Sequence, residues 1–116
     1  MSSTTPEFIR DSGACVVSLN IMKGVAPLRW LVREPSINPS DNGWRFFSAI
    51  DDEAYLDDPR NLSVVSFNEV AAIEPAIIGV YLHPVGSDYE LVRTPEGGMF
   101  FRDNLTGEPL TPAPGR

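Results

Sequence analysis

The chain has 116 residues, of which 42% are hydrophobic and 22% are charged, and its formal net charge is −7. This length suits one domain with one core, and the lack of a long apolar run argues against a membrane-spanning helix. The acidic excess disfavours nucleic acid as a partner, because a phosphate backbone attracts Lys and Arg. The first fifteen residues, MSSTTPEFIRDSGAC, have neither a basic start nor an apolar stretch, so we expect a cytoplasmic protein.

Six segments rich in β-branched or aromatic residues are bounded by turn residues, and we expect each to form a strand. They span residues 14–20, 28–33, 43–48, 61–67, 88–93 and 98–102. A short helix is expected over 51–56, and a second one is expected to follow Asn68 as its N-cap and to end before Pro75. Residues 76–82 are apolar and lie between two prolines, which indicates either a helical turn or a buried irregular connection.

This order of elements predicts an α+β domain with a mainly antiparallel sheet of about five or six strands and two or three short helices. Residues 14–105 form that single domain. We expect a flexible N-terminal segment, residues 1–13, before it and a Pro-rich tail, residues 106–116, after it. Within the strands, alternation places Leu28, Trp30 and Val32 on one face, and Trp44 and Phe46 together on another.

The residues that most often carry catalysis are few. His83 is the only histidine, which excludes a multi-histidine zinc site, and no nucleophile elbow selects a serine as its partner. Cys15, the only cysteine, lies in the apolar run Ala14–Val17 and predicts a buried thiol. We therefore expect no catalytic residue, no metal and no cofactor, and we keep a hydrolase only as a second alternative.

Five carboxylates fall within eight residues after the third predicted strand. The run lacks the alternating ligands and central glycine of an EF-hand, so an exposed acidic surface for a protein partner is the simpler interpretation. The residues predicted to bind that partner are Asp51, Asp52, Glu53, Tyr55, Asp57 and Asp58.

Two tryptophans and two arginines form a second candidate group: Trp30, Arg33, Trp44 and Arg45. Aromatic and guanidinium groups together could line a pocket for a carboxylate or a nucleotide. Large aromatics in strands are more often part of the core, however, so structural support for the acidic surface is the other interpretation. A small-molecule or nucleotide-binding regulatory module is thus the first alternative function.

Three stretches give the chain a family resemblance: RWLVREP at 29–35, DNGWRFFS at 41–48 and DDEAYL at 51–56. With them, and with similarity continuing to residue 90, the chain resembles the DUF2185 family, also called the Imm33-like immunity protein domain. The resemblance covers residues 14–90. It implies a bacterial α+β protein that neutralises a cognate toxin by binding rather than by catalysis. The exposed acidic surface predicted above could do so by occluding a basic surface of the toxin.

Overall fold

The computed structural model describes residues 5–110 and contains one six-stranded sheet with the strand order β4-β1-β3-β2-β5-β6. The strands are β1 (Ala14–Ser18), β2 (Leu28–Arg33), β3 (Asp41–Ser48), β4 (Leu62–Ser66), β5 (Asp88–Arg93) and β6 (Met99–Asp103). The helices are α1 (Leu19–Met22), α2 (Glu53–Leu56), η1 (Pro59–Asn61), α3 (Phe67–Ile73) and η2 (Pro75–Val80). Among the described strands, only β1 and β3 pair in parallel, so the predicted α+β domain with a mainly antiparallel sheet is confirmed.

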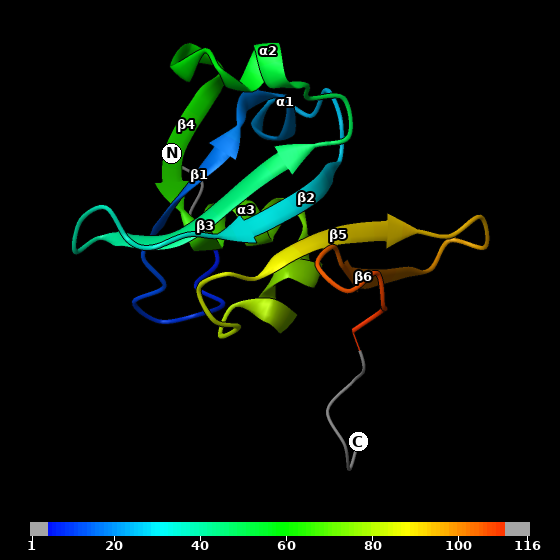
Figure 1. The fold of residues 1–116 in the computed structure, drawn as a ribbon. Helices are drawn as coiled ribbons and strands as arrows, with labels where there is room; N and C mark the ends of the chain where they lie inside the picture. Colours follow the sequence, from blue (N-terminus) through cyan, green and yellow to red (C-terminus); the bar gives the residue numbers. More distant parts are fainter. Residues whose placement is uncertain (1–4, 111–116) are drawn as a thin grey trace.

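The core lies between one face of the sheet and the helices α1, α3 and η2, and Figure 1 shows α3 behind the strands. Trp44 and Phe46 of β3 are fully buried there and stack with their ring centroids 6.0 Å apart, which confirms that they share a face. Phe67 at the start of α3 packs against Phe46. Apolar strand residues and the apolar side of α3 thus bury each other, as the fold requires.

The prediction that Leu28, Trp30 and Val32 of β2 share one face of the sheet is wrong. A bulge between Leu28 and Trp30 interrupts the pairing of β2 with β3. Because the bulge changes the alternation, Leu28 and Leu31 both enter the core, whereas Trp30 is partly exposed on the opposite face. Trp30 is covered there by the guanidinium of Arg29, which lies 4.8 Å from the ring centroid.

Two predicted element boundaries also need correction. The first strand ends at Ser18, whose hydroxyl accepts a hydrogen bond from the N–H of Asn20 and caps α1. Helix α3 is capped by Ser66, whose hydroxyl accepts from the N–H of Glu69 at 3.1 Å, and not by Asn68. The side chain of Asn68 instead holds the main chain of Ile9, which donates to its oxygen at 3.1 Å and accepts from its nitrogen at 2.9 Å.

The last two strands form the predicted hairpin, with a turn over residues 94–98. The apolar segment before it is largely the 3₁₀-helix η2, so the helical alternative holds there. Residues 107–110 turn back along β6, while residues 1–4 of the predicted N-terminal segment and 111–116 of the predicted tail lie outside the described residues. No helix between residues 5 and 110 has the length and apolarity needed to cross a bilayer.

Candidate functional site

Asp51 anchors the connection between β3 and α2. Its carboxylate accepts hydrogen bonds from the N–H of Ser48 at 2.6 Å, from the Ser48 hydroxyl at 2.7 Å and from the side-chain amide of Asn20 at 2.8 Å. Partial burial acts to raise the pKa of Asp51, but these hydrogen bonds outweigh it and the pKa is lowered overall. Asp51 therefore fixes the path of the chain into the acidic run.

Asp52 and Asp58 cap the two short helices of this region. The carboxylate of Asp52 accepts from the N–H of Tyr55 at 2.8 Å at the start of α2. Asp58 accepts from the N–H of Arg60 at the start of η1, and its two oxygens pair with the Arg60 guanidinium at 3.0 and 2.8 Å. The hydrogen bonds from Arg60 lower the pKa of Asp58. Arg60 thus neutralises one end of the run.

The remaining charge of the run faces solvent. Asp52, Glu53 and Asp57 are exposed, and none of them takes part in an ion pair within residues 5–110. Tyr55 lies half-buried between them, with its carbonyl oxygen accepting from the side chain of Asn61 at 2.8 Å. Exposed acidic side chains that make no ion pair are the ones that a basic partner can reach.

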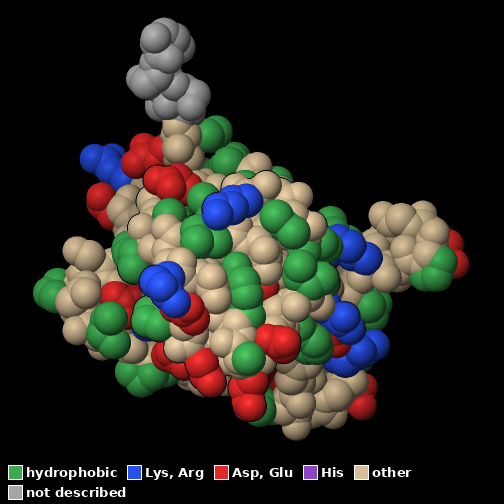
Figure 2. Space-filling view, turned by 90° about the horizontal axis from the view of Figure 1, so that it is seen from above, with side chains coloured by type: hydrophobic (Ala, Val, Ile, Leu, Met, Phe, Trp, Pro, Cys, Tyr) green, Lys and Arg blue, Asp and Glu red, His purple; other side chains and the backbone are tan. Residues whose placement is uncertain are grey.

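Two exposed apolar side chains lie on the connections that flank this region. Ile50 directly precedes Asp51, and Val25 follows α1, where its N–H donates to the carbonyl oxygen of Asn20. The Asn20–Asp51 hydrogen bond joins the two connections that carry them. We call the group Val25, Ile50, Asp52, Glu53 and Asp57 the α2 surface. Figure 2 looks down on this end of the molecule and shows acidic side chains interspersed with hydrophobic and basic ones.

The four residues of the second candidate group do not converge. Trp44 is buried on the helix-covered face, where its indole N–H donates to the carbonyl oxygen of Tyr81 at 3.1 Å. Arg33 lies with it, its guanidinium carbon 5.8 Å from the Trp44 ring centroid, and donates to the carbonyl oxygen of His83 at 2.7 Å. Trp30 and Arg45 lie on the opposite face of the sheet. This arrangement supports the sheet and its loops rather than one shared pocket.

Arg45 closes the loop between β2 and β3. Its guanidinium binds both carboxylate oxygens of Asp41, at 2.8 and 2.9 Å, and Glu34 at 3.1 Å, although Arg45 itself is only 6% exposed. The hydrogen bond from Arg45 holds the pKa of Asp41 well below its usual range, and the same bond raises the pKa of Arg45. The positive charge of Arg45 is therefore paired with acidic side chains of the same chain and holds the loop in place.

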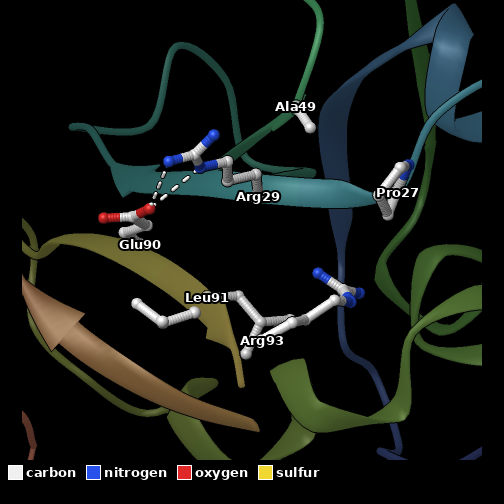
Figure 3. A pocket seen from close by; sticks show the side chains of 7 residues that line it. Pro27, Arg29, Ala49, Glu90, Leu91 and Arg93 are labelled. Carbon is white, nitrogen blue, oxygen red and sulfur yellow. Dashed lines mark hydrogen bonds and ion pairs between the residues drawn. The ribbon is translucent and has the colours of Figure 1, made fainter. Parts of the chain in front are cut away.

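A cavity of about 320 Å³ lies between β2 and β5, and the sequence did not indicate it. The two strands pair only over Trp30–Val32 and Asp88–Glu90, so their ends diverge and leave the space shown in Figure 3. Arg29 pairs with Glu90 at 2.8 Å across its mouth, while Arg93 donates to the carbonyl oxygen of Leu28 and pairs with Glu74. Each charged side chain that lines the cavity thus already has a partner. These charged residues come from two strands about sixty positions apart in the sequence, so no local motif reveals the cavity.

The groups considered for catalysis are engaged elsewhere. Nδ1 of His83 lies 2.6 Å from the hydroxyl of Tyr89, within hydrogen-bond distance. The thiol of Cys15 is fully buried, as predicted, and burial raises its pKa to about 12. Within residues 5–110, no three His, Cys, Asp or Glu side chains lie close enough together to hold a metal ion.

Comparison with known proteins identifies the family. The protein-family model described as the immunity protein Imm33 domain matches residues 15–102, which is most of the chain. No curated protein and no solved structure gave a match. The matched region runs from β1 into β6 and contains the α2 surface, so it extends beyond residues 14–90, on which the resemblance rested. The chain therefore belongs to the Imm33 immunity protein domain family.

Proposed function

We propose that this protein binds a cognate toxin and occludes its active surface without catalysing a reaction. Membership of the Imm33 immunity protein family is the observation that carries this proposal. Occlusion needs a rigid surface with unpaired charge rather than an active site. The α2 surface fits that need, because Asp51 and the two helix caps hold its backbone while Asp52, Glu53 and Asp57 remain free of ion pairs within the described chain.

The partner expected at the α2 surface is a protein with a basic surface, such as one that handles nucleic acid. Opposite charges accelerate the encounter and set the orientation, and a net charge of −7 adds to this steering. Ile50 and Val25 supply exposed apolar area beside the charges. Protein interfaces commonly combine an apolar centre with a polar rim in this way. Six residues were predicted from the sequence to bind the partner. Of these, we propose that Asp51, Tyr55 and Asp58 hold the backbone of the α2 surface in place, and that the other three contact the partner.

The first experiment identifies the partner. The tagged protein is used to capture binding proteins from a lysate of its own bacterium at low salt, and each captured protein is then expressed with and without this chain. We expect one captured protein to arrest growth alone and to be harmless when co-expressed. Recovery of partners that are never toxic would contradict the immunity function.

The second experiment locates the interface on that partner. The triple variant Asp52→Ser, Glu53→Ser and Asp57→Ser removes the free charge, and serine at position 52 can still cap α2. We expect its Kd for the toxin to rise by more than about tenfold, because desolvated charge contacts often carry 1.4 kcal/mol or more. The matched control changes three exposed glutamates away from α2, namely Glu7, Glu96 and Glu108, to serine.

The control separates a local contact from the effect of total charge. Both triple variants change the net charge by the same amount, so a general electrostatic attraction weakens equally in both. A loss of binding in the α2 triple alone supports the α2 surface. Equal losses, or no loss in either variant, would show that the toxin binds elsewhere on the protein.

A further inference from the structure

The two edges of the sheet differ in how they are closed. At the β6 edge, the chain's own residues 107–110 cover the strand: Asp103 donates to the carbonyl oxygen of Glu108 and Leu110 donates to that of Phe101, both at 2.8 Å. At the other edge lies β4, and within residues 5–110 no further strand pairs with it (Figure 1). Among the residues that the structure describes, the fold thus covers the β6 edge and leaves the β4 edge unpaired.

The sequence of β4 lacks the residues that usually protect a sheet edge. Its sequence, LSVVS, contains no charged residue and no proline, and its register with β1 runs without a bulge from Leu62 to Ser66. Natural edge strands generally avoid association by means of lysines, prolines or bulges. An uncharged, regular edge on a chain of net charge −7 is therefore unusual, and it can meet an identical strand without local repulsion.

The pairing with β1 shows which main-chain groups of β4 face outward. The N–H of Phe67 donates to the carbonyl oxygen of Gly13 at 2.9 Å, one position beyond the last pair of the ladder. Hydrogen-bonded and non-hydrogen-bonded pairs alternate in an antiparallel ladder. The main-chain N–H and C=O groups of Leu62, Val64 and Ser66 must therefore point away from β1.

Two of these six groups are already used inside the molecule. The N–H of Leu62 donates to the carbonyl oxygen of Pro59 at the end of η1. The carbonyl of Ser66, as the N-cap of α3, accepts the first hydrogen bond of that helix. The outward groups that remain are the C=O of Leu62, both groups of Val64 and the N–H of Ser66.

These four outward groups can pair with the same four groups of a second copy of the chain. If two copies of β4 pair antiparallel about a twofold axis at Val64, the two Val64 residues exchange both of their hydrogen bonds. Ser66 of each copy then donates to the carbonyl of Leu62 in the other. The N–H of Leu62 and the C=O of Ser66 would face each other in the same pair, but each already has a hydrogen-bond partner inside its own copy, in η1 and α3 respectively.

We propose that the β4 edge binds a second copy of this chain, which joins two six-stranded sheets into one. The side chains agree with the backbone. Val64 is 72% exposed, and Ile37 beside it, across an apolar cavity of about 100 Å³, is 77% exposed. A twofold axis at Val64 brings the two Val64 side chains together with Ile37 at either side, so each copy covers apolar surface of the other. This association is independent of toxin binding.

Sedimentation equilibrium of the purified full-length chain tests the proposal. We expect the average mass to rise with concentration from 12.7 kDa towards twice that value, because a five-residue strand gives a small interface. A mass that stays at 12.7 kDa up to millimolar concentration would overturn the proposal and leave a strand of another protein as the remaining occupant of this edge.

Charge variants at Val64 identify the interface. Val64→Lys and Val64→Glu each place like charges opposite each other, so each variant alone should remain monomeric. An equimolar mixture of the two should form a heterodimer, which shows that both variants are folded. The control Leu82→Lys changes an exposed residue away from β4 and should dimerise like the wild type. A dimer that persists in both Val64 variants, or a mixture that stays monomeric, would refute pairing through β4.

Discussion

Asp41 is the residue whose ionisation the fold depends on most clearly. Its carboxylate binds the Arg45 guanidinium through both oxygens and also accepts from the N–H groups of Ile37 and Gly43, each at 2.9 Å. These contacts, led by the bond from Arg45, keep the pKa of Asp41 below its ordinary value of 3.8. Folding thus favours the ionised form, and protonation of Asp41 weakens the fold.

The sign of the pH dependence follows from this lowered pKa. A carboxyl group with a depressed pKa in the folded state contributes stability above the unfolded pKa, and this contribution is lost as the pH falls. We therefore expect the free energy of unfolding to decrease from pH 4 to pH 2 less steeply in Asp41→Asn than in the wild type, measured by urea denaturation with tryptophan fluorescence. The control Asp57→Asn, at an exposed position, should keep the wild-type slope. Equal slopes in all three proteins would refute the role of Asp41.

Burial of single residues could be predicted from the sequence, but the partners of charged residues could not. Cys15, Trp44 and Phe46 are buried because apolar side chains in strands gain most from leaving water. In contrast, Arg45 pairs with Glu34 and Asp41 rather than with the acidic run that follows it. The chain has 16 acidic residues, and proximity in space, which the sequence does not show, selects among them.

At the scale of elements, Ser66 and Asn68 have different tasks although they stand two residues apart. Ser66 caps α3, whereas Asn68 ties the segment around Ile9 to that helix. We expect Ser66→Ala to cost about 1 kcal/mol in the free energy of unfolding, as is usual for an N-cap. We expect Asn68→Ala to cost about 1–3 kcal/mol, because both main-chain groups of Ile9 lose their partner.

Hydrogen exchange separates the two tasks. In Asn68→Ala, the amide of Ile9 should exchange much faster while the α3 amides stay protected; in Ser66→Ala, the amide of Glu69 should exchange faster and that of Ile9 should not. Chemical denaturation gives the two costs in stability. If Ile9 remains protected in Asn68→Ala, the side chain of Asn68 does not hold the N-terminal segment.

The elements themselves follow from local sequence, with errors where two signals compete. The bounds of β2 and β5 agree with the prediction because turn residues stand on both sides of each strand. The face of β2 could not be predicted, since a bulge leaves no mark in the alternation of six residues. Both Ser66 and Asn68 are good N-cap residues, and only the position of the chain after β4 decides between them.

At the scale of the whole molecule, the order of strands could not be derived from the sequence. β1 lies between β3 and β4, and β2 lies between β3 and β5, so the sheet mixes neighbours in sequence with distant ones. The strand propensity of a local segment does not predict which strands pair, because contacts between residues far apart in the sequence decide the pairing. The cavity between β2 and β5 and the open edge at β4 are consequences of that order. Neither feature is visible in a motif.

The protected β6 edge leads to a last prediction about association. Residues 107–110 cover β6, so a chain ending at Thr106 should expose a second edge beside the one at β4. A molecule with two open edges can pair at both and form long assemblies, whereas one open edge closes at a dimer. We expect sedimentation velocity to show species larger than dimers for the chain truncated after Thr106. A chain truncated after Leu110 keeps the cover and should match the full-length protein; if both truncated chains behave alike, residues 107–110 do not protect the edge.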